Sequence, residues 1–429
     1  PWAQVGNDTS PYYINSGYSV ATYQRGDRKI YGMTIPENMK STNLKPERKN
    51  AWEVGLDWRF LDSRIGVDLT YYKENTRNQI MTINVPWESG VKEKLINAGN
   101  IQNSGIEIAL NTTPIKKKQW QWDLNFTYTR NRNKIVELSP DVTSYINLDG
   151  AANYGNYRIA SVAKVGSDYG MLMSDSWIKT DEKTGKPVVG YTNKFRTVYY
   201  KRGGTVKEVG SMLPNFLGSL NSTLRWKDLS LYVLFDVRFG GYVASYNSRY
   251  ATAYGFSGET EKYRKGMTWT SKYANAQDKV FTDGFIPDVV FDAGTIVTTP
   301  GGTNQDVSGM TYQEAYEKGY VEPAHLQSAA YFKNSWGTGV INDDWFKKIN
   351  YIALREITLS YNVPTKISSY IGAKNLSLSF TGRNLAYLLN TAPNHENPES
   401  VRGTGAAQFR MRSFMPYTAS YLFTLNATF

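Results

Sequence analysis

The sequence predicts an all-β chain whose strands form part of a transmembrane antiparallel β-barrel. Apolar and polar residues alternate with a period of two through long segments, as in a strand with one apolar and one polar face. The links between these segments alternate between short and long. Mean hydropathy is only −0.49, and no run approaches the roughly 18–20 apolar residues of a spanning helix. A barrel is compatible with this low mean hydropathy, because apolar and polar residues alternate along each of its strands.

Composition excludes several classes of protein. The 429 residues carry 41% apolar and 20% charged residues, too apolar and too weakly charged for a disordered chain. The absence of cysteine excludes thiol catalysis, iron–sulfur clusters and disulfides, and two histidines make a multi-histidine metal site unexpected. We therefore expect no metal and no cofactor. The formal net charge of +11 is compatible with nucleic acid, acidic lipid or water as the neighbour of the basic groups.

The strand signal is regular along the chain. Every even position from Trp52 to Phe60 is apolar, and after a short turn Ile65, Val67 and Leu69 share one face. The segment 417–429 is the cleanest, with apolar residues at nearly every odd position. Strands are predicted at about 49–60, 64–85, 99–113, 119–135, 214–226, 229–243, 346–362, 375–390 and 415–429.

Loop lengths predict which end of the barrel faces outward. Short periplasmic turns and long extracellular loops are typical of outer-membrane barrels. We read residues 1–429 as one barrel portion with long extracellular loops at about 10–48, 86–98, 136–213, 244–345 and 391–414. Nine strands do not close an even-numbered barrel, and Pro1–Thr9 is typical of the upper part of a further strand. We therefore expect the C-terminal part of a larger barrel, without its plug domain.

Several motifs resemble one family, the SusC/RagA-type TonB-linked (TonB-dependent) outer-membrane transporters. They are Ala3–Thr9, Asn43–Glu47 followed by Trp52–Asp57, Val67–Tyr72, Asn97–Glu107, Trp122–Phe126, Phe235–Gly241, Leu354–Tyr361, Gly382–Leu385 and the terminal Phe429. The resemblance implies a 22-stranded barrel in the bacterial outer membrane with an N-terminal plug, a SusD-like lipoprotein lid and energy supplied through TonB. It also implies import of oligosaccharides or oligopeptides, and an assembly signal that ends at Phe429.

The loop aromatic and basic residues are the candidate ligand- or partner-binding groups, because rings cover apolar sugar faces while polar neighbours hold hydroxyls. The alternative is that each ring packs the loops or meets the lid. The candidates are Tyr191, Tyr199, Tyr200, Arg249, Tyr250, Tyr254, Trp269 and Tyr273, with Lys262, Tyr263 and Arg264 nearby.

Charged residues on the polar side of the strands are assigned to the lumen, since an ionised group facing lipid near midplane costs about 2–4 kcal/mol for Lys or Arg. They would line a wet interior and brace the plug, with direct substrate contact as the alternative. This set is Asp57, Arg59, Asp68, Asp123, Arg225, Asp236 and Arg238.

No catalytic arrangement is expected. His325 and His395 fall in predicted loops, where solvated side chains are the simpler interpretation. Lys116–Lys118 invites a nucleic-acid or lipid interpretation, but its short turn before Trp120 and Trp122 favours a solvated turn beside an aromatic girdle. We expect no nucleic-acid partner.

The predicted function is TonB-dependent import of an oligomeric nutrient, with glycan favoured over peptide as cargo. The expected partners are a SusD-like lipoprotein, TonB, outer-membrane lipid and the oligosaccharide or oligopeptide ligand. A passive porin shares the alternation and girdles but needs neither plug nor lid. A soluble lectin sandwich would bury its apolar faces in a dry core, which the structure can test.

Overall fold

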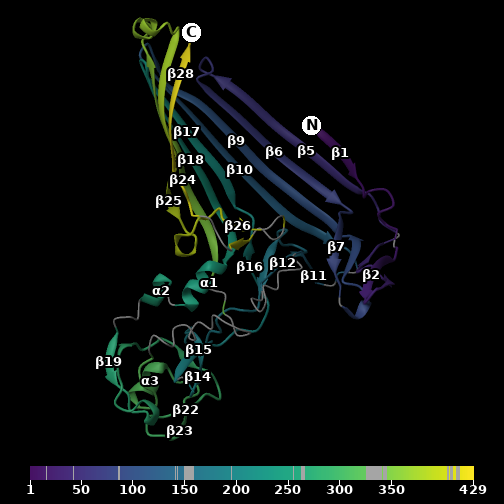
Figure 1. Ribbon diagram of the computed structural model, residues 1–429, viewed down its shortest axis with the longest axis vertical. Coiled ribbons are helices and arrows are strands. Elements are labelled where there is room, and N and C mark those ends of the chain that lie inside the picture. Colours follow the sequence, from purple (N-terminus) through teal and green to yellow (C-terminus); the bar gives the residue numbers. More distant parts are fainter. Residues whose placement is uncertain are drawn as a thin grey trace.

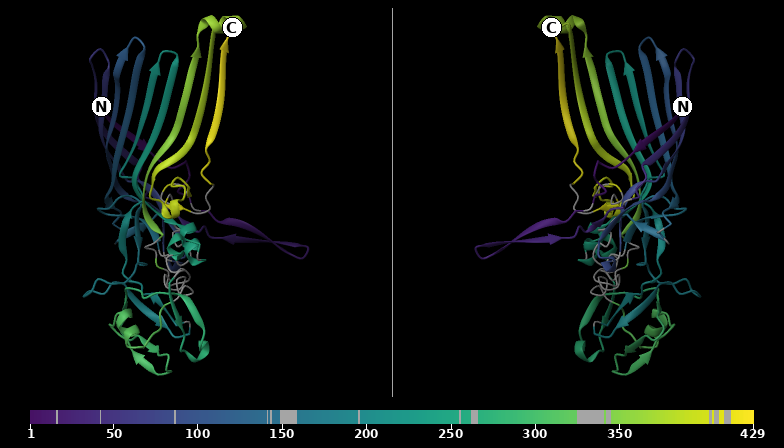
Figure 2. Two further views of the ribbon diagram at one scale, coloured as in Figure 1. Left: turned by 90° about the vertical axis from the view of Figure 1, so that its left-hand side faces the viewer. Right: turned by 90° about the vertical axis from the view of Figure 1, so that its right-hand side faces the viewer.

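A computed structural model shows a curved antiparallel sheet with folded connections gathered at one end (Figures 1 and 2). It describes the chain apart from residues 16, 42, 86, 141, 143, 149–158, 195, 255, 262–265, 325–340, 342–344, 403–404, 406–408 and 412–415. The main sheet has 12 strands, in the order β1-β5-β6-β9-β10-β17-β18-β24-β25-β28, with β26 and β27 joined beside β18. β1 and β28 form its edges, and it does not close on itself within the described residues.

The long strands lie close to the ranges that alternation predicted, so the all-β antiparallel expectation is confirmed. They are β1 (Trp2–Asn7), β5 (Glu47–Phe60), β6 (Ile65–Arg77), β9 (Gly99–Lys117), β10 (Trp120–Leu138), β17 (Phe216–Trp226), β18 (Leu229–Ser245), β24 (Phe346–Val363), β25 (Asn375–Asn390) and β28 (Ser420–Thr428).

Two predicted strand boundaries were wrong. The range 64–85 is divided, because Asn78 adopts a positive φ of 54° and turns the chain out of the main sheet. The remainder, β7 (Ile80–Asn84), pairs with β8 (Glu93–Asn97), which also pairs with β4 (Asn38–Met39). The final strand begins at Ser420 rather than near 415.

The strand register brings the apolar residues of neighbouring strands level with one another. Leu56 pairs with Leu69, which pairs with Ile108, which pairs with Tyr128. Across the other half of the sheet, Val233 pairs with Ile357 and Leu359 with Phe380. The face is exposed: Trp58 is 59% and Phe423 73% accessible. The apolar rows therefore form an outer band and not the dry centre of a sandwich, as a lipid-facing barrel wall requires.

Aromatic residues gather where the strands meet their short turns. The rings of Trp120 and Trp226 stack with centroids 5.5 Å apart, and Trp58 and Phe60 lie 5.4 Å apart. Lys227 sits 5.3 Å from the Trp226 ring. Amphipathic rings beside cationic turns are typical of a membrane–water interface, as expected of a girdle.

Short and long connections lie at opposite ends of the sheet (Figure 1). The turn after β5 is built from three residues in the left-handed region, with φ of 53° at Leu61, 52° at Asp62 and 59° at Ser63. The longest link at this end, after β24, holds α5 (Thr365–Ser368) and η4 (Ser369–Ile371). The C-terminus lies at this same end (Figure 1).

The long connections fold into small sheets of their own. The sheet nearest the barrel end contains β11 (Tyr145–Asn147), β12 (Ile159–Lys164), β13 (Met171–Ser174) and β16 (Lys207–Ser211). The hairpin of β2 (Ser19–Arg25) and β3 (Arg28–Thr34) projects away from the rest (Figure 2). Short pieces are α1 (Tyr246–Ala253), α2 (Gly258–Glu261), η1 (Trp87–Ser89), η2 (Ala274–Ala276), η5 (Pro393–His395), β26 (Val401–Arg402) and β27 (Arg410–Met411).

A compact loop subdomain lies farthest from the barrel strands (Figure 2). Its core packs Val189, Val198, Phe291 and Tyr312, all at most 1% exposed. The elements are β14 (Val188–Thr192), β15 (Thr197–Tyr200), β19 (Met267–Thr270), β20 (Val280–Gly284), β21 (Val290–Phe291), β22 (Ile296–Thr298), β23 (Asn304–Asp306) and α3 (Tyr312–Glu317). Within the described residues, no helix combines the length and apolar character needed to span a membrane.

Phe429→Ala is predicted to lower the amount of assembled barrel in the outer membrane. Phe429 continues the apolar odd positions of β28 and is 71% exposed, so its loss removes a terminal aromatic without leaving a cavity. The measurement is the folded, heat-modifiable fraction in isolated outer membranes. Tyr370→Ala is the control, because this 83% exposed ring lies at the same end of the sheet. Equal assembly of both variants would show that Phe429 is no assembly signal.

Candidate functional site

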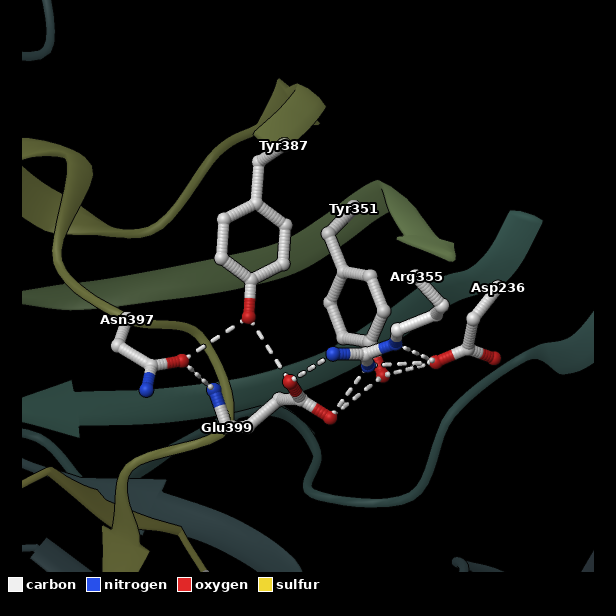
Figure 3. Close-up of polar contacts among 6 residues, drawn as sticks. All are labelled: Asp236, Tyr351, Arg355, Tyr387, Asn397 and Glu399. Carbon is white, nitrogen blue, oxygen red and sulfur yellow. Dashed lines mark hydrogen bonds and ion pairs between the residues drawn. The ribbon is translucent and has the colours of Figure 1, made fainter. Parts of the chain in front are cut away.

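A network of charged and phenolic side chains lies on the polar face of the sheet, near its long-loop end. Its centre is Arg355 on β24, and its partners come from β18, β25 and the segment that follows β25 (Figure 3). The network sits where the wall meets the folded connections, so it fixes the position of one connection against the barrel.

A β-bulge directs Arg355 to the polar face. Before it, the even positions Ile352 and Leu354 follow the apolar row, and after it the odd positions Ile357 and Leu359 do. Against β18, the consecutive residues Leu234 and Phe235 pair with Glu356 and Leu354, so Arg355 is the extra residue on β24. Bulges re-aim a side chain in this way, and the guanidinium is kept away from the lipid face.

Arg355 joins two carboxylates from distant parts of the chain. Its Nη1 and Nη2 donate to the two oxygens of Glu399 at 2.7 and 2.6 Å, a bidentate pair. Its Nε and Nη2 also donate to Asp236 Oδ2 at 3.2 and 2.6 Å. Bidentate, charge-assisted bonds are among the strongest polar contacts in proteins, and the Arg355 side chain is only 18% exposed.

Two tyrosines and an amide complete the shell around Glu399. Tyr387 Oη donates to Glu399 Oε2 at 2.8 Å and to Asn397 Oδ1 at 3.0 Å (Figure 3). Asn397 Oδ1 also accepts from the Glu399 backbone N–H at 3.1 Å. Tyr351 Oη lies 3.4 Å from Asp236 and 3.5 Å from Glu399. Although burial raises the pKa of Glu399, hydrogen bonds from Arg355 and Tyr387 hold it below its ordinary value.

These contacts tie residues 391–411, which we call the strap, to the polar face. The described strap residues Ala392 and Met411 pack with Val243, Ile349 and other buried residues of β18 and β24. β27 adds a short parallel pairing to the end of β18, and β26 pairs with β27. The strap therefore folds over the inner side of the wall.

The strap also contacts the start of α1. Glu396 is 7% exposed and accepts from Ser245 Oγ at 3.1 and 3.0 Å, and Ser245 is the N-cap of α1. Asn394 Nδ2 donates to Ser248 Oγ at 2.7 Å. The pKa of Glu396 is raised, because the effect of burial outweighs that of the hydrogen bonds, which lower the pKa. A carboxylate is stabilised near a helix N-terminus, so this contact joins strap and helix.

The polar-face residues predicted to line the lumen form local ion pairs on the strands. Arg59 lies 2.5 Å from Asp57 and 3.1 Å from Asp68. Arg225 bonds Asp123 at 2.8 Å. Only two members of the predicted set lie at the strap: Asp236 belongs to the Arg355 network, and Arg238 lines a neighbouring hollow. That hollow has a volume of about 350 Å³, and Glu399 and Tyr351 also line it. Their role toward plug or substrate remains a prediction.

The predicted loop residues fall into two groups instead of one site. Tyr191, Tyr199, Tyr200 and Tyr273 belong to the loop subdomain, where Tyr191 Oη lies 3.3 Å from Tyr273 Oη. Burial raises the pKa of both phenols. Tyr200 packs against the buried core, and the Tyr199 ring covers Gly190, where an added Cβ would lie 2.5 Å from it.

Trp269 joins this first group through Glu322. Its ring stacks on Phe281 at 4.7 Å, and its Nε1 donates to Glu322 Oε2 at 3.3 Å. Glu322 also accepts from Ser271 Oγ at 2.8 Å. These groups fix the fold of the subdomain, and their contact with ligand or lid remains a prediction.

Arg249, Tyr250 and Tyr254 form the second group, on α1 beside the strap. Arg249 is 4% exposed, with its guanidinium 5.8 Å from the Trp345 ring. The ring of Tyr250 lies between those of Tyr246 and of Tyr254, the C-cap of α1, with centroid separations of 5.0 and 6.3 Å. Tyr254 is 65% exposed. Lys262, Tyr263, Arg264 and His325 lie outside the described residues.

Sequence reasoning missed Arg355, Glu399, Tyr351 and Tyr387 as a set. The change in apolar parity between Leu354 and Ile357 was a readable sign of a bulge that turns Arg355 inward. Nothing in the sequence pairs it with Glu399, which is 44 residues away. Among the described residues, no group of three or more His, Cys, Asp or Glu could hold a metal ion.

Comparisons with known proteins agree with this geometry. Residues 4–193 match the family model described as TonB dependent receptor-like, beta-barrel. TonB-dependent receptor P26 of Formosa agariphila is 23% identical over 363 residues, which is 82% of this chain and 31% of the relative. TonB-dependent receptor SusC of Bacteroides thetaiotaomicron is 29% identical over 180 residues, 41% of this chain and 17% of the relative.

Solved structures show the same fold over the whole chain. The RagAB peptide transporter superposes with a TM-score of 0.64 at 17% identity and covers 100% of this chain and 40% of its own. The RagAB peptide importer in its open-open state gives 0.61 at 14% identity, covering 100% and 39%. The chain thus spans at most 31% of the length of the curated relatives described above.

The wall defined by these strands is that of an outer-membrane β-barrel. The resemblance carried by the sequence motifs is confirmed: residues 4–193 match the TonB-dependent receptor β-barrel, and the chain is similar to TonB-dependent receptors that include SusC and has the fold of RagAB. The family is one of receptors and transporters of the bacterial outer membrane and not one of enzymes.

Arg355→Gln is predicted to loosen the strap. It leaves Asp236 and Glu399 facing each other without their shared cation, at a cost of about 2 kcal/mol to the closed strap. Because the chain has no cysteine, Ser400→Cys accepts a single nitroxide, whose mobility reports the opening. Arg383→Gln is the control, since Arg383 bonds Glu356 at 2.9 Å on the wall without reaching the strap. Equal mobility in both variants would contradict the tether.

Acidification is predicted to open the same contact. The folded-state pKa of Glu399 is lowered, so the stability it contributes is present above the unfolded value of about 4.3. It is lost as pH falls through the lower, folded pKa. The nitroxide at position 400 is expected to stay ordered from pH 7 to about 5 and to become mobile only at a pH below the unfolded value of about 4.3. In the Glu399→Gln background this transition is expected to disappear, and its persistence would assign the opening to another group.

Proposed function

We propose that this protein imports an oligosaccharide across the outer membrane, with energy supplied through TonB and with a SusD-like lipoprotein as lid. The row of tyrosines on α1 and its C-cap, half-buried at Tyr246 and Tyr250 and exposed at Tyr254, carries this proposal and is called the tyrosine ladder. Tyr246, Tyr250 and Tyr254 follow one another along a helix that begins directly after the barrel strand β18. Their rings would lie in the path from the loops to the interior.

The ladder fits the chemistry of a sugar chain. Aromatic faces cover the apolar faces of sugar rings, while neighbouring polar groups hold hydroxyls. The centroid separations of 5.0 and 6.3 Å match the ring-to-ring spacing of stacked aromatic groups. The polar face beyond, with Asp236, Arg238 and Glu399, offers further hydrogen-bonding groups to a hydrated cargo.

The mechanism would consist of binding and gating, without bond chemistry. Cargo held between the loops and the lid would reach the strap, whose contacts to Arg355 and α1 lie on the interior side. Displacement of the strap, and of a plug beyond it, would open the path. The similarity to TonB-dependent receptors supports the use of TonB, because the receptors that match this chain carry that dependence in their names.

The double substitution Tyr250→Ala and Tyr254→Ala is predicted to weaken oligosaccharide binding about tenfold, because two ring contacts of about 0.5–1.5 kcal/mol each are lost. Calorimetry of the full protein with its lipoprotein, against panels of oligosaccharides and oligopeptides, measures the change. Tyr31→Ala is the control, since Tyr31 is 69% exposed on the projecting β2–β3 hairpin.

The alternatives predict different results in the same measurements. Heat released only by oligopeptides would identify a peptide importer of the same family. Uptake that continues after the loss of TonB would identify a passive porin. Unchanged sugar affinity in the double variant would remove the tyrosine ladder from the cargo path.

A further inference from the structure

The outer face of the wall changes from apolar to polar or cationic residues at one level on neighbouring strands. Along β10 the same-face positions pass from Phe126 and Tyr128 to Arg130, Arg132 and Lys134, without a break in register over this stretch. The matching change occurs on β9 from Ile106 to Ser104 and on β6 from Tyr71 to Lys73. Because side chains alternate between faces, these basic residues share the face of the apolar band.

Strand register and side-chain exposure both place the basic residues on the outer face of the sheet. Arg130 pairs with Ile106, which is 39% exposed, and Arg132 pairs with Ser104. On the adjoining strand, Ser104 pairs with Lys73. Arg130, Arg132 and Lys134 are all exposed, and none of the three takes part in an ion pair within the part of the chain that the structure describes.

The position along β10 corresponds to a headgroup layer. The stretch from Trp120, in the aromatic girdle, to Tyr128 has about the length of 9–11 residues that a tilted strand needs to cross the hydrocarbon. Arg130 therefore follows directly above the far side of the apolar band. The folded loops lie at this end (Figure 1), so this is the outer leaflet when the long loops face outward.

The basic residues line a hollow instead of a flat surface. β10 pairs with β17 only as far as Thr129 with Leu217, so a notch opens beside the rest of β10. Residues Leu213–Asn215 and the segment around Gly166 border it. The hollow has a volume of about 460 Å³ and is also lined by Gln102, Ser104 and one carboxylate, Asp168. Three cations against one anion leave it positively charged.

We propose that this hollow binds the phosphate of a phosphorylated lipid headgroup in the outer leaflet. The two guanidiniums and the ammonium would hold phosphate oxygens, which Arg binds in bidentate fashion. Gln102 and Ser104 would meet neighbouring hydroxyls, while the acyl chains follow Phe126, Ile106 and Tyr71 down the apolar band. The site is separate from the cargo path, since it lies on the opposite face of the wall from Arg355.

The test is native mass spectrometry of the full protein in detergent, titrated with diphosphoryl lipid A. Arg130→Gln, Arg132→Gln and Lys134→Gln together are expected to weaken binding about 100-fold, from about a fivefold loss for each of the three cations near a charged membrane surface. The matched control changes Lys116, Lys117 and Lys118 to Gln, which removes the same charge at the short-turn end. It is expected to bind like the unchanged protein.

A second variant and further titrations each support or overturn the proposal. If the heat-modifiable band shows that the triple variant does not assemble, Arg132→Gln alone replaces it and is expected to weaken binding about fivefold. Equal binding by the basic-site variants and the control overturns the proposal. So does equal binding of the same lipid without its phosphates. Saturation of the site by inorganic phosphate at the concentration that suffices for the lipid would overturn the headgroup assignment.

Discussion

The register of the antiparallel strands is the constraint on which the rest of the structure depends. Since side chains alternate strictly, a slip of one residue between two strands would turn a whole apolar row toward the interior. The observed register keeps Leu56, Leu69, Ile108 and Tyr128 level, and the band continues to Phe423 on β28. This single requirement fixes the outer surface, the polar inner face and the level at which basic residues meet headgroups.

The β-bulge at Arg355 interrupts the strict alternation of side chains between the two faces, and this interruption has a structural role. Strict alternation would place the guanidinium among Ile357 and Leu359 on the apolar face, where a cation is costly. One extra residue turns it inward, where Asp236 and Glu399 bind it. The wall thereby gains a fixed anchor for the strap at the same position, so lipid compatibility and the tether have one structural cause.

The folded loops divide their aromatic residues by role. In the loop subdomain, Tyr191 and Tyr273 are held by burial and by each other, and Trp269 is held by Phe281 and Glu322. On α1, Tyr254 stays exposed at the end of a stacked row. Aromatic richness alone does not separate rings that build a scaffold from rings available to a ligand, because both are large, amphipathic and common in long loops.

Alternation and loop length by themselves determined the strand positions, the apolar outer face and the girdle tryptophans, because those features depend on local periodicity. They did not determine the end of β6 at Arg77, the inward fold of residues 391–411, or the partnership of Arg355 with Glu399. These features depend on contacts between segments far apart in the chain, which carry no local signal. Only the tertiary structure brings together the side chains of β18, β24, β25 and the strap.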